Sequence, residues 1–315
     1  MSDQHVIFGT GAIGLALCES LRRRDVGAIR MVNRSGKADV PTGVEVVAAD
    51  VSDPALAVAA AKGATSVYQA LNPPYAQWVE LFPGLQAGVV AAAEAAQARL
   101  VSMENVYMYG RPAGSPLTED RPYLAHTKKG QLRGRMADAL MAAHRAGRIE
   151  VAIGRASDYF GPNGGAQSNL GDRLFGPALA GKTASLLGDP DQPHTYTYIP
   201  DIGEGLAVLG LHPDAVGEIW HLPNDPDTRT TRHLVEVTYR LAGQPKAKVR
   251  VLPAPLISAV GLLNPTVREL SEMRYLFQEP FVVDSSKIRD RLGVVATPVE
   301  EALATTMAGY RSPTR

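Results

Sequence analysis

The chain has 315 residues, of which 45% are hydrophobic and 20% charged, so it can bury a sizeable core in one large or two modest domains. Lys plus Arg equals Asp plus Glu at 32 each, which argues against binding to nucleic acid or to an anionic membrane surface. Cys18 is the single cysteine, so an internal disulfide is excluded, and no residue cluster has metal-ligand spacing. With no signal-peptide pattern and no membrane-length apolar run, we expect a cytoplasmic protein.

A glycine-rich turn stands near the start of the chain. Residues 5–8 predict a short apolar strand, and residues 15–21 predict a helix. Between them lie Gly9, Thr10, Gly11, Ala12, Ile13 and Gly14, a G-x-G-x-x-G pattern that is typical of dinucleotide binding in this context. Gly9 permits the tight turn, Gly11 lets the backbone approach a pyrophosphate, and Gly14 permits close helix–strand packing. The alternative is an ordinary glycine turn.

The second predicted strand ends in a polar loop that bears on the choice of cofactor. Residues 28–32 predict the strand, and Asn33, Arg34, Ser35 and Lys37 follow it. An NAD-binding fold usually carries an acid about 20 residues beyond the glycines, where it binds the ribose hydroxyls. No acid stands here, and the Arg34 guanidinium is suited to a 2′-phosphate, so we expect NADP in preference to NAD. The alternative is a solvated basic loop.

Strands and helices alternate through the rest of the first half. The pattern predicts strands at 44–47, 65–69, 100–103 and 149–153. It predicts helices from Ser52 or Asp53 to Lys62, from 75 or 77 to 98, and at 127–146. The second of these helices is rich in Ala and is expected to be interrupted near Pro83. This alternation is typical of an α/β fold with a doubly wound parallel sheet, the Rossmann architecture. Ligands bind such sheets at the carboxyl ends of the strands, which makes Asp50, Val51 and Asn72 candidates.

The second half of the chain changes character. Pro and Gly punctuate residues 161–200, and the pattern then predicts a helix at 204–211, a strand at 218–222, a helix at 232–241 and a strand at 249–252. We expect residues 1–160 to form the dinucleotide-binding domain. Residues 161–315 then form a smaller, partly interleaved substrate-binding region, with some segments returning to the first domain.

Five stretches of the chain resemble one known family. They are residues 9–14, 50–51, 106–110, 155–162 and 198–201. The chain is similar to short-chain dehydrogenases/reductases of the extended or atypical branch, the group of NAD-dependent epimerases and dehydratases. The resemblance implies that Asp50 and Val51 lie beside the adenine, and that the loop carrying Leu71 and Asn72 passes along the cofactor. It also implies that the loop carrying Tyr159 meets the nicotinamide end.

The catalytic signature departs from that of the family, which places a Tyr four residues before a Lys. Here Leu124 stands four before Lys128 and Ala125 four before Lys129, while Tyr123 stands five before Lys128. A serine expected after the fifth strand is replaced by Asn105, whose amide can still donate to a reacting oxygen. Tyr107 and Tyr109 bracket the same place. We therefore treat Asn105, Tyr107, Tyr109 and Tyr123 as catalytic candidates, and each phenol can instead simply line the pocket.

Lys128 is the preferred partner for the cofactor ribose, because it follows a Thr much as the family Lys follows a Ser or Thr. The alternative is two solvated lysines in the first turn of the helix.

The resemblance implies an NAD(P)-dependent oxidoreductase that transfers hydride to or from a small carbonyl or enone compound, or an epimerase/dehydratase acting through transient oxidation. The missing Tyr keeps open a non-catalytic NADP-binding sensor. We expect a small-molecule substrate and a possible homodimer through helices near 90–98 and 132–140.

Overall fold

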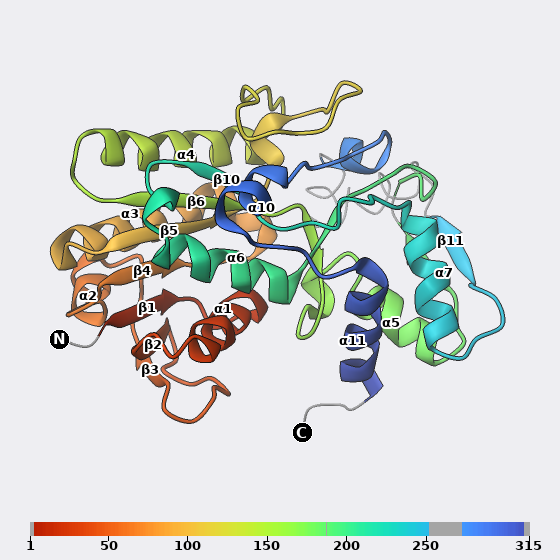
Figure 1. The fold of residues 1–315 in the computed structure, drawn as a ribbon, viewed down its shortest axis with the longest axis horizontal. Coiled ribbons are helices and arrows are strands. Elements are labelled where there is room, and N and C mark those ends of the chain that lie inside the picture. Colours follow the sequence, from red (N-terminus) through yellow and green to blue (C-terminus); the bar gives the residue numbers. More distant parts are fainter. Residues whose placement is uncertain (1–2, 187, 252–272, 312–315) are drawn as a thin grey trace.

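Seven parallel strands form the central sheet of the computed structural model, which describes residues 3–186, 188–251 and 273–311 (Figure 1). They are β1 (Gln4–Phe8), β2 (Ala28–Asn33), β3 (Glu45–Ala48), β4 (Ser66–Gln69), β5 (Arg99–Glu104), β6 (Val151–Arg155) and β10 (Ile219–His221). Their order is β10-β6-β5-β4-β1-β2-β3, and neighbouring strands pair in parallel. The doubly wound α/β fold predicted from the sequence is confirmed.

Helices cover both faces of this sheet. Those on one face are α1 (Ala12–Arg23) and α6 (Ile199–Leu211), and those on the other are α2 (Pro54–Ala60), α3 (Trp78–Ala96) and α4 (Lys128–Arg145). Asp53 caps α2 by accepting from the backbone N–H of Ala55, and Thr127 caps α4 by accepting from that of Gly130. Because both faces are covered, every residue of β4 and β6 is buried.

The expected interruption of the Ala-rich helix near Pro83 is wrong. Pro83 lies inside α3, which runs without a break from Trp78 to Ala96. A proline removes the N–H that would bond the carbonyl four residues earlier, here that of Val79. Val79 is 52% exposed, so water can solvate the carbonyl that loses its partner.

A smaller region lies beside the carboxyl ends of the main strands, at the right of Figure 1. Its strands form two parallel pairs, β7 (Asp158–Phe160) with β9 (Tyr196–Tyr198) and β8 (Ala184–Leu186) with β11 (Val249–Val251). Its helices are α5 (Asp172–Leu179), α7 (Thr231–Leu241) and α11 (Val299–Arg311), which share a core around Leu174, Phe175 and Leu234. Leu252, the predicted end of the last strand, lies outside the described residues.

The C-terminal half also returns to the main sheet. Strand β10 pairs with β6 at its edge, and α6 packs against α1, where a Cβ on Gly203 would lie 2.4 Å from the Ala16 carbonyl carbon. The short helix α10 (Ser286–Leu292) places buried Ile288 in the same core. This is the interleaving that the sequence predicts, while the exact boundary at residue 160 stays a prediction. The remaining short helical turns are η1 (Tyr75–Gln77), η2 (Tyr107–Tyr109), η3 (Gly165–Gln167), η4 (Pro213–Ala215) and η5 (Arg274–Phe277).

The strand order reverses between β1 and β4, and the glycine-rich turn stands at this point. Gly9 has φ +118°, and a Cβ there would lie 2.5 Å from the Ala70 carbonyl oxygen at the end of β4. Crevices at such reversals are where doubly wound sheets bind ligands.

None of the helices in the described part of the chain combines the length and apolarity that a membrane crossing requires.

Candidate functional site

The three glycines of the turn have different surroundings. A Cβ on Gly14 would lie 2.2 Å from the Gly9 carbonyl oxygen, so the chain itself requires glycine there. A Cβ on Gly11 would meet no heavy atom within 4 Å. Gly11 is the N-cap of α1, whose first turn carries no acidic residue and receives no side-chain cap. The open space therefore lies at an uncapped helix N-terminus, which fits a cofactor diphosphate.

Asn33 fastens the loop that follows β2. Its Oδ1 accepts from the N–H of Gly36 at 2.7 Å and from the N–H of Ser35 at 3.0 Å. Its Nδ2 donates to Thr10 Oγ1 and to the Lys37 carbonyl, both at 2.9 Å. Arg34 and Ser35 remain exposed at the loop tip. The structure thus places Thr10, Asn33 and Ser35 in one hydrogen-bonded group beside the glycine turn.

Asp50 and Val51 follow β3 and lie toward the same loop. Hydrogen bonds from the Ser52 hydroxyl and N–H lower the pKa of the Asp50 carboxyl, and the positive charge of Arg34 adds to this effect. Val51 is 3% exposed and packs in the core with Ala57. Asp50 therefore offers an exposed carboxylate near Arg34, while the next residue, Val51, anchors this segment in the core.

A cavity of about 310 Å³ opens at the carboxyl ends of β4, β5 and β6. Ile13, Leu71, Asn72 and Tyr159, four of the predicted cofactor contacts, line it together with the catalytic candidates Asn105 and Tyr107. Asn72 Nδ2 donates to Gln167 Oε1 at 3.1 Å, which joins the main sheet to the smaller region across this cavity. The structure brings these predicted residues together. Tyr109, Tyr123 and Lys128 do not line the cavity.

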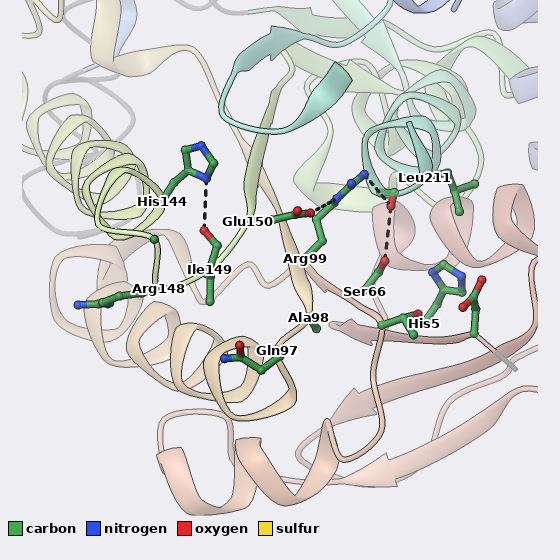
Figure 2. Close-up of a pocket in the computed structure, with 14 residues that line it drawn as sticks. His5, Ser66, Gln97, Ala98, Arg99, His144, Arg148, Ile149, Glu150 and Leu211 are labelled. Carbon is green, nitrogen blue, oxygen red and sulfur yellow. Dashed lines mark hydrogen bonds and ion pairs between the residues drawn. The ribbon is translucent and has the colours of Figure 1, made fainter. Parts of the chain in front are cut away.

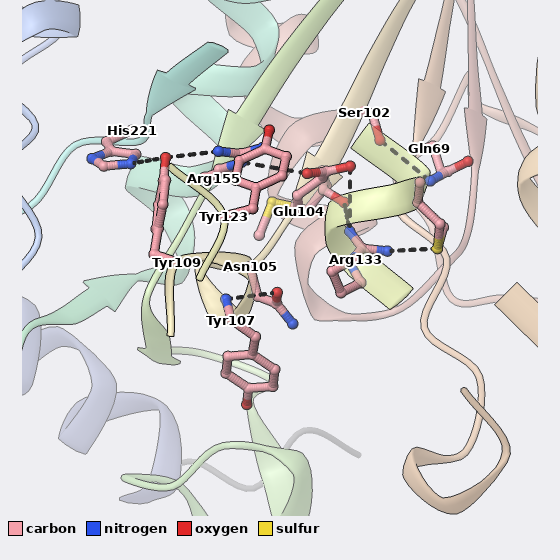
Figure 3. Close-up of polar contacts among 12 residues, drawn as sticks. Gln69, Ser102, Glu104, Asn105, Tyr107, Tyr109, Tyr123, Arg133, Arg155 and His221 are labelled. Atoms are coloured by element: carbon pink, nitrogen blue, oxygen red, sulfur yellow. Dashed lines mark hydrogen bonds and ion pairs between the residues drawn. The ribbon is translucent and has the colours of Figure 1, made fainter. Parts of the chain in front are cut away.

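Tyr109 and Tyr123 instead serve a buried arginine (Figure 3). Arg155 Nη1 donates to the Tyr109 hydroxyl at 2.7 Å, and Nη2 donates to that of Tyr123 at 2.5 Å. His221 Nδ1 donates to the Asp284 carbonyl at 2.7 Å, so its Nε2 accepts from the Tyr109 hydroxyl at 2.8 Å. Burial lowers the pKa of His221 to about 4 and raises that of Tyr109 to about 12, so both groups are neutral at pH 7.

The two lysines at the start of α4 differ in burial. Lys129 is 1% exposed, with its ammonium 4.3 Å from the centroid of the Tyr75 ring, whereas Lys128 is exposed. Because the helix begins at Lys128, its buried face includes Lys129, Arg133, Met136 and Leu140. The structure therefore turns Lys129, and not the preferred Lys128, toward the interior.

Tyr107 is the phenol among the catalytic candidates that reaches the cavity. Its ring stacks on Trp78 with centroids 6.0 Å apart, and burial raises its pKa well above that of a free phenol. Asn105 Oδ1 accepts from the Tyr107 N–H at 3.2 Å, an orientation that leaves the amide nitrogen to donate elsewhere. Burial also raises the pKa of Tyr159 to about 12. At neutral pH the cavity thus holds protonated phenols beside an amide.

Sequence reasoning missed the charged residues of this cavity. Glu104 at the end of β5 and Arg133 on α4 line it, as does Asp158. Asp158 accepts from Asn169 Nδ2 at 2.9 Å and contacts His194 Nε2 at 2.8 Å. Two signals were available, an acid directly after the apolar strand at 100–103 and an arginine four residues after Lys129 on the apolar helix face.

A second cavity of about 570 Å³ lies at the opposite edge of the sheet (Figure 2). His5, Ser66 and Arg99, from the amino ends of three strands, line it. Arg99 donates to the carbonyls of Gly210 at 3.2 Å and His212 at 2.9 Å, where it closes the end of α6. Since the glycine turn lies at the carboxyl ends of the strands, this cavity is separate from the candidate cofactor site.

Comparisons with known proteins agree with this geometry. The model of the NAD dependent epimerase/dehydratase family matches residues 6–222. The structure is similar to that of dTDP-glucose 4,6-dehydratase from Bacillus anthracis in complex with NAD, with 14% identity, TM-score 0.79 and coverage of 99% of this chain and 97% of the other. It is also similar to UDP-N-acetylglucosamine 4-epimerase from Bacillus cereus, with 14% identity, TM-score 0.79 and coverage of 100% and 98%. No curated protein sequence matches the chain.

Proposed function

Because the chain belongs to the NAD dependent epimerase/dehydratase family, we propose that it is an oxidoreductase that uses NADP in preference to NAD. It transfers hydride to or from a small carbonyl or enone compound, and epimerisation or dehydration through transient oxidation is the close variant. Membership of the family supports this general type of function. The cavity of about 310 Å³ supports a small substrate.

The observation that carries the proposal is the pairing of two features at the end of β1 and β2. Gly11 faces open space at the uncapped start of α1, which suits a diphosphate. The loop that Asn33 fastens presents the exposed guanidinium of Arg34, which suits a 2′-phosphate.

When bound, NADP supplies the hydride carrier, and the residues around the cavity supply positioning and protons. The Asn105 amide donates to the substrate oxygen and stabilises its developing negative charge. Tyr107, whose phenol remains protonated at neutral pH, hands a proton to that oxygen during reduction and takes it back during oxidation. Trp78 and Phe82 line the same cavity and exclude water from it.

Fluorescence titration of the protein with NADPH and NADH tests the cofactor assignment. We expect NADPH to bind at least tenfold more tightly, and Arg34→Ala to weaken NADPH about tenfold, since a charge-assisted hydrogen bond contributes about 1.5–3 kcal/mol. NADH binding should stay unchanged in this variant. Tighter binding of NADH, or an equal loss for both cofactors, would contradict the preference for NADP.

One observation favours a second candidate, a non-catalytic NADP-binding sensor. Two of the three candidate phenols, Tyr109 and Tyr123, bind Arg155 and do not line the cavity. Consumption of NADPH in the presence of a panel of ketones and enones separates the two functions. Turnover that is lost in Tyr107→Phe identifies the enzyme, whereas tight NADPH binding without any turnover identifies the sensor.

A further inference from the structure

The buried charges at the inner end of the cavity do not balance. Glu104 is 1% exposed, Arg133 2% and Arg155 0%. The two phenols that contact Arg155 are neutral, as is the imidazole that contacts one of these phenols, so this cluster carries two positive charges and one negative. A buried charge without a partner is strongly unfavourable, and proteins normally pair it.

The contacts within the cluster are also long. Arg155 Nε lies 3.4 Å from Glu104 Oε2, and Arg133 Nη2 lies 3.9 Å from Glu104 Oε1 (Figure 3). Charge-assisted hydrogen bonds of this kind are usually about 2.7–2.9 Å. Within the described part of the chain, Glu104 Oε1 and Arg133 Nε have no hydrogen-bond partner at all.

Arg133 is the member whose charge is least compensated. Its Nη2 donates to the Met103 carbonyl at 3.2 Å, its Nη1 contacts the Met136 sulfur at 3.8 Å, and its guanidinium carbon lies 4.7 Å from the centre of the Phe82 ring. None of these partners is an anion. Arg155, by comparison, has two phenol hydroxyls and the nearer carboxylate oxygen.

The other acid of the cavity does not supply the missing charge. His194 Nδ1 faces the Leu276 carbonyl at 3.1 Å and Nε2 faces Asp158 Oδ2 at 2.8 Å. Asp158 Oδ1 in turn accepts from Asn169 Nδ2 at 2.9 Å, so both oxygens of this carboxylate are engaged by groups other than Arg133. Arg173, exposed and also lining the cavity, adds a further positive charge.

We propose that the cavity binds a substrate that carries a carboxylate, seated against Arg133 with an adjacent hydroxyl or oxo group beside Glu104. The negative charge of the substrate carboxylate balances the surplus positive charge of the cluster, and the Arg133 Nε–H gains an acceptor. A substrate hydroxyl can donate to Glu104 Oε1. A phosphate dianion would exceed the surplus charge and meet repulsion from Glu104. The inference rests on the proposed function, because it names the class of small carbonyl or hydroxy compound that this cavity accepts.

Calorimetry with mandelate and its neutral isostere mandelamide tests this assignment, with inorganic phosphate as a third probe. Each is titrated into the protein with and without saturating NADP, after NADPH binding has been measured separately by fluorescence. We expect mandelate to bind at least tenfold more tightly than mandelamide or phosphate. Equal binding of the acid and the amide overturns the proposal, and so does stronger binding of phosphate.

Arg133→Met removes the surplus charge and supplies the matched variant. We expect it to weaken mandelate at least tenfold, to leave mandelamide and NADPH binding unchanged, and to leave the melting temperature of the ligand-free protein unchanged or higher. Arg135→Met, an exposed arginine on the same helix, should change none of these values. A lower melting temperature with mandelate binding retained would assign Arg133 a purely structural role. Failure of NADPH binding alone would instead count against the proposed cofactor.

Discussion

At the scale of single residues, two phenols have different surroundings. That of Tyr107 lines the cavity, whereas that of Tyr123 binds the buried Arg155. Tyr107→Phe removes the proposed proton donor, whose phenol lines the cavity, so we expect kcat to fall about 100-fold to 10,000-fold. NADPH affinity should not change. Tyr123→Phe should keep most of the activity, because its hydroxyl serves Arg155. Steady-state kinetics on the best substrate checks both, and a larger loss in Tyr123→Phe would reverse the assignment.

His221 makes the stability of the protein depend on pH. Its pKa is about 4 in the folded protein because burial disfavours the charged ring, compared with 6.5 for a histidine in an unfolded chain. The unfolded chain therefore binds more protons between these values, so stability is full above pH 6.5 and falls as pH drops toward 4. The loss is about 3 kcal/mol for a shift of this size.

Urea unfolding at several pH values measures this dependence. We expect the free energy of unfolding of His221→Gln to change less between pH 7 and pH 5 than that of the original protein. His233, which is only half-buried, provides a control, and His233→Gln should keep the original slope. Equal slopes in the original protein and His221→Gln would show that other groups cause the acid sensitivity.

The sequence could not show which of the two lysines at the start of α4 faces inward. Two adjacent lysines differ by about 100° around a helix, so the answer depends on the residue at which the helix starts. Thr127 fixes that start by capping Gly130, and the sequence offers no comparable measure of register. The pairing of Glu104 with two arginines was equally hidden, because those arginines lie far away along the chain.

At the scale of elements, the glycine turn permits a matched comparison. Gly11→Ala places a methyl group in open space, so the melting temperature should hold while NADPH binding weakens at least tenfold through loss of the phosphate approach. Gly14→Ala places a methyl 2.2 Å from the Gly9 carbonyl oxygen and should destabilise the fold by about 1–3 kcal/mol. Thermal melts and NADPH titrations distinguish the two, and similar behaviour of the variants would contradict the distinction.

The elements themselves were largely predictable. Apolar runs bounded by polar loops located each strand of the first half, since strands covered on both faces must be almost entirely apolar. The continuity of α3 through Pro83 was not predictable, because it depends on the exposure of Val79 to water. Strand β9 has three residues, which are too few for a reliable sequence pattern.

At the scale of the whole molecule, the N-terminal sheet depends on segments from beyond residue 160. Strand β10 pairs with β6, and Trp220 within it is fully buried with its Nε1 donating to the Ala215 carbonyl at 3.0 Å. Helix α6 covers α1 at Gly203. The sequence indicated that some segments return, but not which strand receives β10, since that pairing joins residues far apart in the chain.

A fragment of residues 1–160 should therefore fail to fold on its own. Without α6 and β10, the apolar surface of α1 and β6 is exposed to water, and the lost burial exceeds the small net stability of a domain. We expect a non-cooperative urea transition by circular dichroism, with the full chain measured in parallel. A sharp cooperative transition of the fragment would show that the first 160 residues are an autonomous unit.

The side-chain amide of Asn33 helps to shape the loop after β2, and its oxygen accepts from two backbone N–H groups. An aspartate keeps this accepting oxygen, so Asn33→Asp preserves those two hydrogen bonds while it replaces the donor to Thr10 and to the Lys37 carbonyl with a negative charge. On the proposed function, that charge would repel the 2′-phosphate and favour the plain ribose. On the same proposal, a single substitution at residue 33 is expected to move the cofactor preference from NADP toward NAD.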